Sequence, residues 1–201
     1  MGSKALDSLL EQPWIYRVSQ FLFSLGGEKV TPRIKQLLTQ LPPAQHILDI
    51  GCGPSSSLWK VGLHPIGLDL SHAYILTFRR RGGAAVNGSA VALPFPDRSF
   101  DGVWSFGLLH HLSDSEVRRA VCEMIRICRP GGYLVIVDAV LPDLAWRRPA
   151  AYLIRRADRG KFVRREEHFR ALLPSGKNFV MERITYSLSR LEAILVYGVC
   201  S

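Results

Sequence analysis

The most constraining feature of this sequence is a short apolar run that ends in a carboxylate and then in two closely spaced glycines. It spans residues 46–54 and reads HILDIGCGP. An apolar run of this length that stops at glycines predicts a buried strand leading into a helix. In such a turn the bare backbone and the positive end of the helix meet a nucleotide-like ligand. We therefore expect ligand contacts at Asp49, Gly51, Cys52 and Gly53.

A second apolar strand ends in an acid about twenty residues later. Residues 66–71 read IGLDLS. Asp69 therefore lies near the end of its apolar run, as Asp49 does in the first. A carboxylate at this position can accept two hydrogen bonds from the 2′,3′ diol of a ribose. Leu70, which follows it, is expected to lie against a flat base. The two acids predict one shared nucleoside-like ligand.

Chain length and composition indicate one globular domain. The chain has 201 residues, of which 47% are hydrophobic and 21% are charged. This is enough apolar material for one core, and a second independent domain is not expected. The formal net charge is +9. A basic surface is compatible with nucleic acid, an anionic membrane or an acidic substrate, and does not distinguish among them.

The sequence favours a soluble, cytoplasmic protein. No stretch approaches the ~18–20 apolar residues that cross a bilayer, and the first residues lack the pattern of a secretory signal. The cysteine spacing matches neither a zinc site nor a dense disulfide scaffold, so we expect no metal and a reducing compartment. The cysteines are Cys52, Cys122, Cys128 and Cys200. Cys52 is expected to pack in the turn, and Cys122 and Cys128 to face the core from a helix.

Short apolar runs alternate with helical patterns along most of the chain, which predicts a parallel sheet covered by helices on both faces. Two helices are expected between residues 14 and 41, before the first strand. Strands are then expected near residues 46–50, 65–69, 84–87, 100–106 and 133–139. Helices are expected near residues 54–60, 72–81, 114–128 and 165–173, with Asp114 as the N-cap of the third. Residues 178–188 and 191–200 are expected to form an antiparallel hairpin at one edge of the sheet.

Two further strand ends add candidate ligand contacts. Ligands of such sheets bind at the carboxyl ends of the strands. Ser89 and Ala90 follow the third strand and are expected to meet the edge of the base. Phe106 ends the fourth strand and is expected to line the remaining wall.

Four segments together resemble the type 11 family of class I S-adenosylmethionine-dependent methyltransferases. They are ILDIGCGP (47–54), IGLDLS (66–71), LPFPDRSFDGVWSFGLLHHL (93–112) and RPGGYLVIVDA (129–139). The resemblance implies a Rossmann-like, doubly wound α/β fold. Its seven-stranded sheet would be mostly parallel, with an antiparallel C-terminal strand and helices on both faces. It also implies that S-adenosylmethionine is the cofactor, held by the residues named above.

The resemblance divides the single domain, residues 1–201, into four parts. They are N-terminal helices (1–44), a cofactor-binding core (45–140), a basic insertion on the substrate side (141–165), and a final helix with a β-hairpin (166–201). Two positions depart from the family pattern. Ser55 stands where a third glycine is usual, and the helix from Pro54 is expected to be one turn short. Ser89 stands where an aspartate commonly contacts the adenine amino group.

His110 and His111 follow the fourth strand, where a methyl acceptor would lie. We expect His110 to be the better candidate for a catalytic general base, which a hydroxyl acceptor needs and an amine does not. The alternative is that both histidines only pack and hydrogen-bond in this loop.

The acceptor side is basic and aromatic. Residues 144–165 carry eight arginines and lysines against the single acid Asp158, interleaved with Trp146, Tyr152 and Phe162. This pattern favours a small-molecule or lipid-like acceptor that is anionic, with contact to an anionic membrane surface. A merely solvated helix is an equal alternative, nucleic acid is disfavoured, and the oligomeric state is left open.

Two other functions remain open from the residues. One is a non-catalytic protein that binds S-adenosylmethionine and activates a partner. The other is a nicotinamide-dependent oxidoreductase, which is disfavoured because the turn lacks the third dinucleotide glycine.

Overall fold

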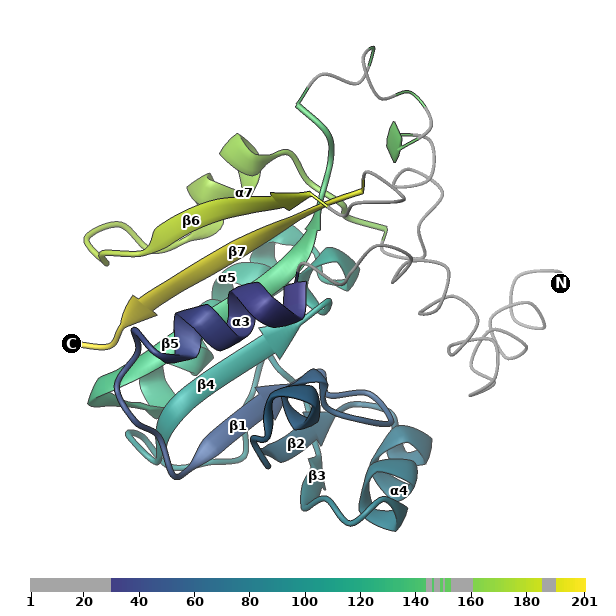
Figure 1. Ribbon diagram of the computed structural model, residues 1–201, viewed down its shortest axis with the longest axis vertical. Helices are drawn as coiled ribbons and strands as arrows, with labels where there is room; N and C mark the ends of the chain where they lie inside the picture. Colours follow the sequence, from purple (N-terminus) through teal and green to yellow (C-terminus); the bar gives the residue numbers. More distant parts are fainter. Residues whose placement is uncertain (1–29, 144–145, 147–148, 150, 153–160, 186–190) are drawn as a thin grey trace, which may run out of the picture.

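The chain folds around one seven-stranded sheet with the order β3-β2-β1-β4-β5-β7-β6 (Figure 1). The computed structural model describes residues 30–143, 146, 149, 151–152, 161–185 and 191–201. The strands are β1 (Ile47–Ile50), β2 (Ile66–Asp69), β3 (Ala85–Asn87), β4 (Phe100–Phe106), β5 (Cys128–Val140), β6 (Val180–Thr185) and β7 (Glu192–Val199).

Strand direction brings the predicted site residues to one edge of the sheet. β1 pairs in parallel with β2 and β4, β2 with β3, and β4 with β5. β7 pairs antiparallel with both β5 and β6. The predicted mostly parallel sheet with an antiparallel C-terminal strand is therefore confirmed. The carboxyl ends of β1, β2, β3 and β4 lie together, as a shared ligand site requires.

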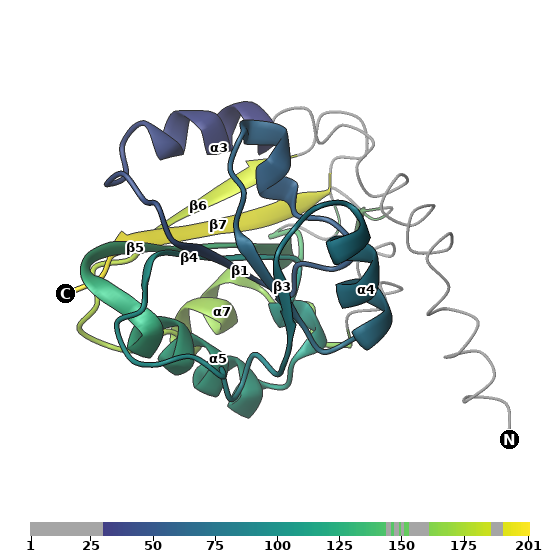
Figure 2. The same cartoon turned by 90° about the horizontal axis from the view of Figure 1, so that it is seen from below.

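Helices cover both faces of the sheet (Figure 2). They are α3 (Val30–Leu38), α4 (His72–Arg80), α5 (Asp114–Ile127) and α7 (Glu166–Leu172), with two 3-10 helices, η2 (Ser57–Val61) and η3 (Leu109–His111). α5 and α7 bury side chains such as Val121 and Phe169 in one core cluster, together with Leu48 and Val103 of the sheet. α3 packs in a second cluster with Trp104. The two clusters cover opposite faces because successive residues of a strand point to opposite sides.

Several predicted boundaries were wrong. The helix expected at 54–60 is only η2, which starts at Ser57 with Ser56 as its N-cap. Serine hydroxyls compete for backbone groups and so disfavour a regular helix here. α5 is capped by Ser113, in a capping box with Glu116, and Asp114 is its first residue. β5 begins at Cys128 rather than near residue 133, with a break in its pairing to β4.

The parts of the chain that flank the core are only partly described. α3 is the second of the two helices expected between residues 14 and 41, whereas the first lies outside the described residues. Most of the basic insertion also lies outside them. Within the described ranges, no helix is long and apolar enough to cross a membrane.

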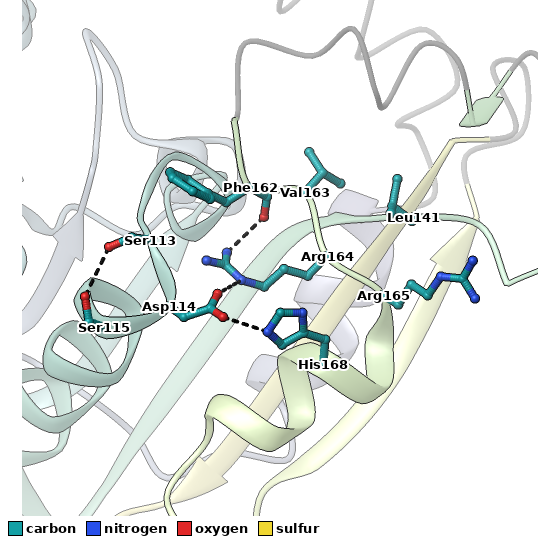
Figure 3. A pocket seen from close by; sticks show the side chains of 9 residues that line it. All are labelled: Ser113, Asp114, Ser115, Leu141, Phe162, Val163, Arg164, Arg165 and His168. Atoms are coloured by element: carbon teal, nitrogen blue, oxygen red, sulfur yellow. Dashed lines mark hydrogen bonds and ion pairs between the residues drawn. The ribbon is translucent and has the colours of Figure 1, made fainter.

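Buried Arg164 joins the end of the basic insertion to the loop before α5 (Figure 3). Its guanidinium donates to the carbonyl oxygens of Leu109 at 3.0 Å and Leu112 at 2.6 Å. The same group donates to a carboxylate oxygen of Asp114 at 2.8 Å. A short backbone bridge pairs Arg164 with Val140 at the end of β5. One residue therefore joins three segments that are distant in sequence, the loop before α5 through its side chain and the end of β5 through its backbone.

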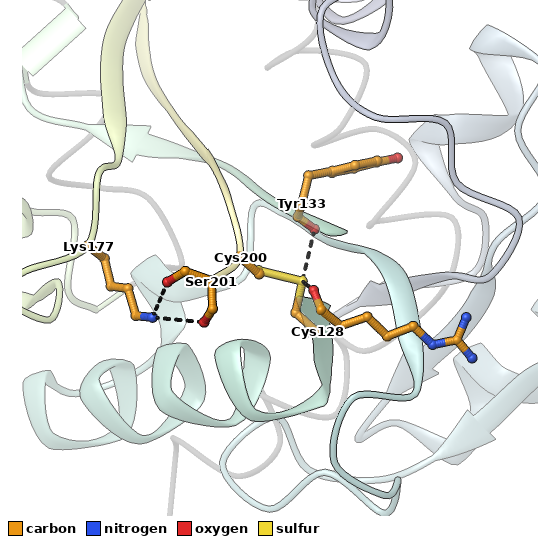
Figure 4. Close-up of a disulfide and its surroundings, with 6 residues drawn as sticks. Cys128, Tyr133, Lys177, Cys200 and Ser201 are labelled. Atoms are coloured by element: carbon orange, nitrogen blue, oxygen red, sulfur yellow. Dashed lines mark hydrogen bonds between the residues drawn. A yellow bond between two sulfur atoms is a disulfide. The ribbon is translucent and has the colours of Figure 1, made fainter. Parts of the chain in front are cut away.

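The expectation of unpaired cysteines was wrong for two of the four. Cys128 and Cys200 form a disulfide that joins the first residue of β5 to the residue after β7 (Figure 4). Of the two free cysteines, Cys52 is buried and Cys122 is exposed. Cys122 therefore does not face the core. The spacing gave no sign of the pair because 72 residues separate its members.

Arg164 offers a test of this packing. Arg164→Leu leaves the carbonyl groups of Leu109, Leu112 and Phe162, and the carboxylate of Asp114, without their donor. We expect a loss of ~3 kcal/mol of unfolding free energy. For a chain of this size, the loss corresponds to a fall in Tm of roughly 6–12 °C. Arg165→Leu, a matched change at an exposed neighbour, should leave Tm nearly unchanged. Equal Tm values for the two variants, measured by calorimetry, would contradict the role of Arg164.

Candidate functional site

The turn after β1 needs its two glycines for their backbone conformation. Gly51 has φ +72° and Gly53 has φ +60°, in the left-handed region that other residues rarely adopt. A Cβ at Gly51 would lie 3.0 Å from the Cβ of Leu108. Leu108 belongs to the loop between β4 and η3. The turn predicted to hold a ligand is thus packed directly against the loop that carries His110.

Asp49 is buried in this turn with one of its carboxylate oxygens engaged. The Ser56 hydroxyl donates to Oδ2 at 2.6 Å. Oδ1 is buried and has no hydrogen-bond partner among the described residues. Burial raises the pKa of Asp49 to about 7, the Ser56 hydrogen bond opposes this rise, and the charge of Asp69 adds to it. The orphaned oxygen can accept a hydrogen bond from a ligand cation.

Asp69 links the end of β2 to the glycine turn. Its Oδ2 accepts from the backbone N–H of Gly53 at 2.9 Å, and its Oδ1 accepts from that of Ser71 at 2.8 Å. Burial raises the pKa of Asp69, although the backbone amides that it accepts from oppose the rise. Each carboxylate oxygen has more than one acceptor position. The group can therefore still receive the hydroxyls of a ribose.

Leu70 is the most exposed of the large apolar side chains described, at 76%. It follows Asp69, which places an uncovered apolar surface beside the acid. The Asn87 side chain donates to the carbonyl oxygens of Asp69 and Leu70, each at 2.9 Å. Sequence reasoning missed this residue. The sequence showed only a polar amide at the end of the third strand. In the structure this amide holds the backbone at the end of the neighbouring strand β2.

Ser89 and Ala90 lie in a tight turn after β3 and are both half-buried. The Ser89 hydroxyl accepts from the backbone N–H of Val91 at 3.4 Å. Ala90 packs against the core cluster beneath α5. The backbone N–H of Gly88 donates to the backbone carbonyl of Asp69 at 3.1 Å, which holds this turn beside the end of β2.

Cys52 is 5% exposed, and its thiol donates to the carbonyl of Gly53 at 3.4 Å. A Cβ at Gly67 would lie 2.6 Å from its sulfur, so the thiol fills the space that this glycine leaves. Burial raises the pKa of the thiol well above its ordinary value. Cys52 therefore packs as a neutral thiol, and its backbone forms the turn.

Phe106 is half-buried at the end of β4, and Gly107 turns the chain toward η3. His110 follows and is 9% exposed, whereas His111 is exposed. The Nδ1 atom of His110 lies 2.5 Å from a carboxylate oxygen of Asp138, at the carboxyl half of β5. Asp138 was not singled out from the sequence, although it ends the apolar run of the fifth strand.

Asp138 is placed to orient the imidazole. Its Oδ2 accepts from the backbone N–H groups of Leu109 at 2.5 Å and His110 at 3.2 Å, and its Oδ1 accepts from Ala139 at 2.6 Å. Burial alone would raise the pKa of Asp138, but His110 and these amides hold it below its usual value. An ionised Asp138 accepts from Nδ1–H, which makes Nε2 the basic nitrogen of His110.

The residues brought together fit a ligand with an ammonium group, a ribose and a flat base. Asp49 offers a buried carboxylate oxygen, Asp69 offers acceptors for a diol, and Leu70 offers an apolar surface. His110 lies in η3, two residues after Leu108, which packs against Gly51 of the turn. Among the described residues, no group of three or more histidines, cysteines and acids could hold a metal ion.

Part of the chain matches a known family of domains. Residues 48–136 match the family model described as a methyltransferase domain. The chain is 38% identical over 125 residues to the probable tRNA methyltransferase 9B of Homo sapiens, covering 61% of this chain and 27% of that protein. It is 35% identical over 129 residues to a demethylmenaquinone methyltransferase of Renibacterium salmoninarum, covering 61% of this chain and 53% of that protein. The chain thus spans between a quarter and about half of the length of these relatives.

A solved structure from Thermotoga maritima has the same fold. It is described as an S-adenosylmethionine-dependent methyltransferase, possible histamine N-methyltransferase. The TM-score is 0.70 at 20% identity, and the match covers 96% of this chain and 99% of that one. The nicotinamide-dependent alternative has no support among these relatives. From the matched domain, the fold and the relatives together, residues 48–136 form a methyltransferase domain, and the chain has the fold of the class I S-adenosylmethionine-dependent methyltransferases.

Proposed function

We propose that this protein transfers the methyl group of S-adenosylmethionine to a hydroxyl group of a small-molecule or lipid-like, anionic acceptor. The observation that carries the proposal is the His110–Asp138 pair, with Nδ1 and Oδ1 2.5 Å apart. A hydroxyl acceptor needs a base, and an imidazole oriented by a carboxylate is well suited to that task. Bound S-adenosylmethionine supplies a methyl group already activated by the positive sulfonium.

The chain's own residues would bind and align the reactants. Asp69 would accept the ribose hydroxyls, Leu70 would cover one face of the base, and Asp49 would accept from the ammonium group. Asp138 would hold Nδ1–H of His110, so that Nε2 takes the proton of the acceptor hydroxyl. Alignment of this kind can lower the activation barrier by several kcal/mol, as it does in well-oriented intramolecular reactions.

A hollow with apolar walls supports a small or lipid-like acceptor. Leu141, Phe162 and Val163 form these walls, and Arg165 adds an exposed cation (Figure 3). Polar side chains line the rest of the hollow, and they are Ser113, Asp114, Ser115, Arg164 and His168. The hollow adjoins the His110 loop, because the backbone N–H of Phe162 donates to the carbonyl of His110 at 3.0 Å. Phe162 is 40% exposed. Apolar walls beside a cation suit an amphiphilic anion, and the same surface is our candidate for contact with an anionic membrane.

RNA is the second candidate acceptor. It is favoured by the net charge of +9 and by the human relative whose name refers to tRNA. A polyanion would use this charge over a wide surface, whereas a small anion needs it only at the hollow.

An acceptor experiment separates these candidates. The protein is incubated with methyl-labelled S-adenosylmethionine and, in separate reactions, with a polar metabolite extract, vesicles containing anionic lipids and quinones, or total tRNA. We expect label in the metabolite or lipid reaction. Label confined to tRNA would replace the proposed acceptor with RNA. No label in any reaction, together with binding of S-adenosylhomocysteine, would favour the non-catalytic alternative.

His110 provides a test of the proposed base. With the labelled acceptor, His110→Ala should slow transfer by roughly 10²–10⁴-fold, since the base then has to be water. Affinity for S-adenosylhomocysteine should stay within a fewfold, because His110 is not placed to hold the cofactor. His111→Ala is the matched control and should retain most of the rate. Equal rates for wild type and His110→Ala would remove the base from the proposal.

Asp49 makes cofactor affinity depend on pH. Its pKa is raised to about 7, so that it is mostly ionised at pH 8 and mostly protonated at pH 6. Only the ionised form pairs with an ammonium group. We expect the Kd of S-adenosylhomocysteine, measured by calorimetry, to rise by about tenfold from pH 8 to pH 6. Asp49→Asn should bind more weakly at pH 8 and show little change with pH; a pH profile unaffected by this substitution would contradict the role of Asp49.

A further inference from the structure

The hydroxyl of Ser56 is fixed by two hydrogen bonds at once. It donates to Oδ2 of Asp49 at 2.6 Å and accepts from the backbone N–H of Leu58 at 3.1 Å. Ser56 is 4% exposed and Asp49 is 2% exposed. A hydroxyl that accepts from the backbone has its proton directed elsewhere, and here that proton meets the carboxylate. The orientation of Asp49 is therefore set by the start of η2.

The other oxygen of Asp49 is left for a ligand. Oδ1 is buried without a hydrogen-bond partner among the described residues. An unsatisfied carboxylate oxygen in a buried site is costly unless a donor meets it. A cationic donor compensates best, because a charge-assisted hydrogen bond is stronger than a neutral one. The ammonium group of an amino acid supplies both the charge and the donor.

This arrangement depends on the serines that replace a regular helix. Because η2 starts only at Ser57, Ser56 remains outside it, in extended backbone from which its hydroxyl reaches seven residues back. Ser55 is half-buried and makes no side-chain hydrogen bond among the described residues. The hydroxyl of Ser57 is buried without a partner among them. Of the three neighbouring serines, Ser56 is the one that bonds the carboxylate.

We propose that Ser56 is a positioning residue that determines ligand specificity. It holds one oxygen of Asp49 so that the other selects nucleosides carrying an amino-acid ammonium group over nucleosides that lack it. The inference rests on the proposed use of S-adenosylmethionine and adds a residue that acts on the cofactor through Asp49. It also gives a role to the short 3-10 helix η2, whose N-cap is Ser56.

The test compares two ligands by calorimetry at pH 8. S-adenosylhomocysteine carries the amino-acid group, whereas 5′-methylthioadenosine shares the nucleoside and lacks it. Ser56→Ala should raise the Kd of S-adenosylhomocysteine about tenfold and leave that of 5′-methylthioadenosine unchanged. Ser55→Ala is the matched control, because it removes a neighbouring hydroxyl that bonds nothing described, and both affinities should stay as in wild type.

A double-substituted variant checks that Ser56 acts through Asp49. In an Asp49→Asn background, Ser56→Ala should have little further effect on S-adenosylhomocysteine binding. Should Ser56→Ala fail to fold, Ser56→Gly removes the same hydroxyl at an N-cap, where glycine is well tolerated.

Four outcomes would overturn the inference. Affinities for the two ligands that fall by the same factor would mean that Ser56 only supports the turn. Unchanged binding of both ligands would mean that its hydrogen bond is dispensable. Wild-type protein that binds 5′-methylthioadenosine but not S-adenosylhomocysteine would refute the selection itself. Wild-type protein that binds neither ligand would instead refute the cofactor assignment, and this inference with it.

Discussion

The loop that follows β4 depends on one buried carboxylate, that of Asp138. Three backbone amides and the His110 imidazole converge on it. In the same loop, Arg164 donates to the carbonyl groups of Leu109 and Leu112. Donors and acceptors of the loop are thus satisfied by two charged side chains from different parts of the chain. A loop whose amides and carbonyls are both bonded in this way has little freedom to rearrange. The loop contacts the cofactor turn through Leu108 and the acceptor side through the His110 carbonyl. The position of both therefore depends on β5, which carries Asp138.

The cofactor side combines negative charge with burial in a protein that is basic as a whole. Asp49 and Asp69 lie close enough for the charge of Asp69 to help raise the pKa of Asp49. This repulsion is unfavourable for the empty protein. A ligand with a positive ammonium group relieves it, because the cation interacts favourably with both acids. Part of the free energy lost in burying two acids would then be recovered as affinity for such a ligand.

Much of the sheet could be predicted from the sequence, because its strands are apolar runs bounded by glycines and acids. The positions of Asp49, Asp69 and Leu70 followed from the rule that ligands meet strand ends. The side chains that hold them did not follow. Asn87 bonds the backbone at the end of another strand. Ser56 reaches Asp49 from extended backbone, because the expected regular helix is replaced by η2, which begins only at Ser57. The pairing of Asp138 with His110 likewise depends on the register between β4 and β5. Contacts of this kind depend on tertiary geometry, which local patterns do not encode.

The disulfide between Cys128 and Cys200 has a topological consequence. It closes a covalent ring that contains β5, β6, β7, α7 and the whole basic insertion. Every element that would meet the acceptor, apart from the His110 loop and the start of α5, lies inside this ring. A single peptide bond broken anywhere within the ring leaves the chain as one covalent piece, with the cofactor half still attached to both new ends. The acceptor side can therefore tolerate a cut, or accept an inserted segment, without the loss of its C-terminal strands.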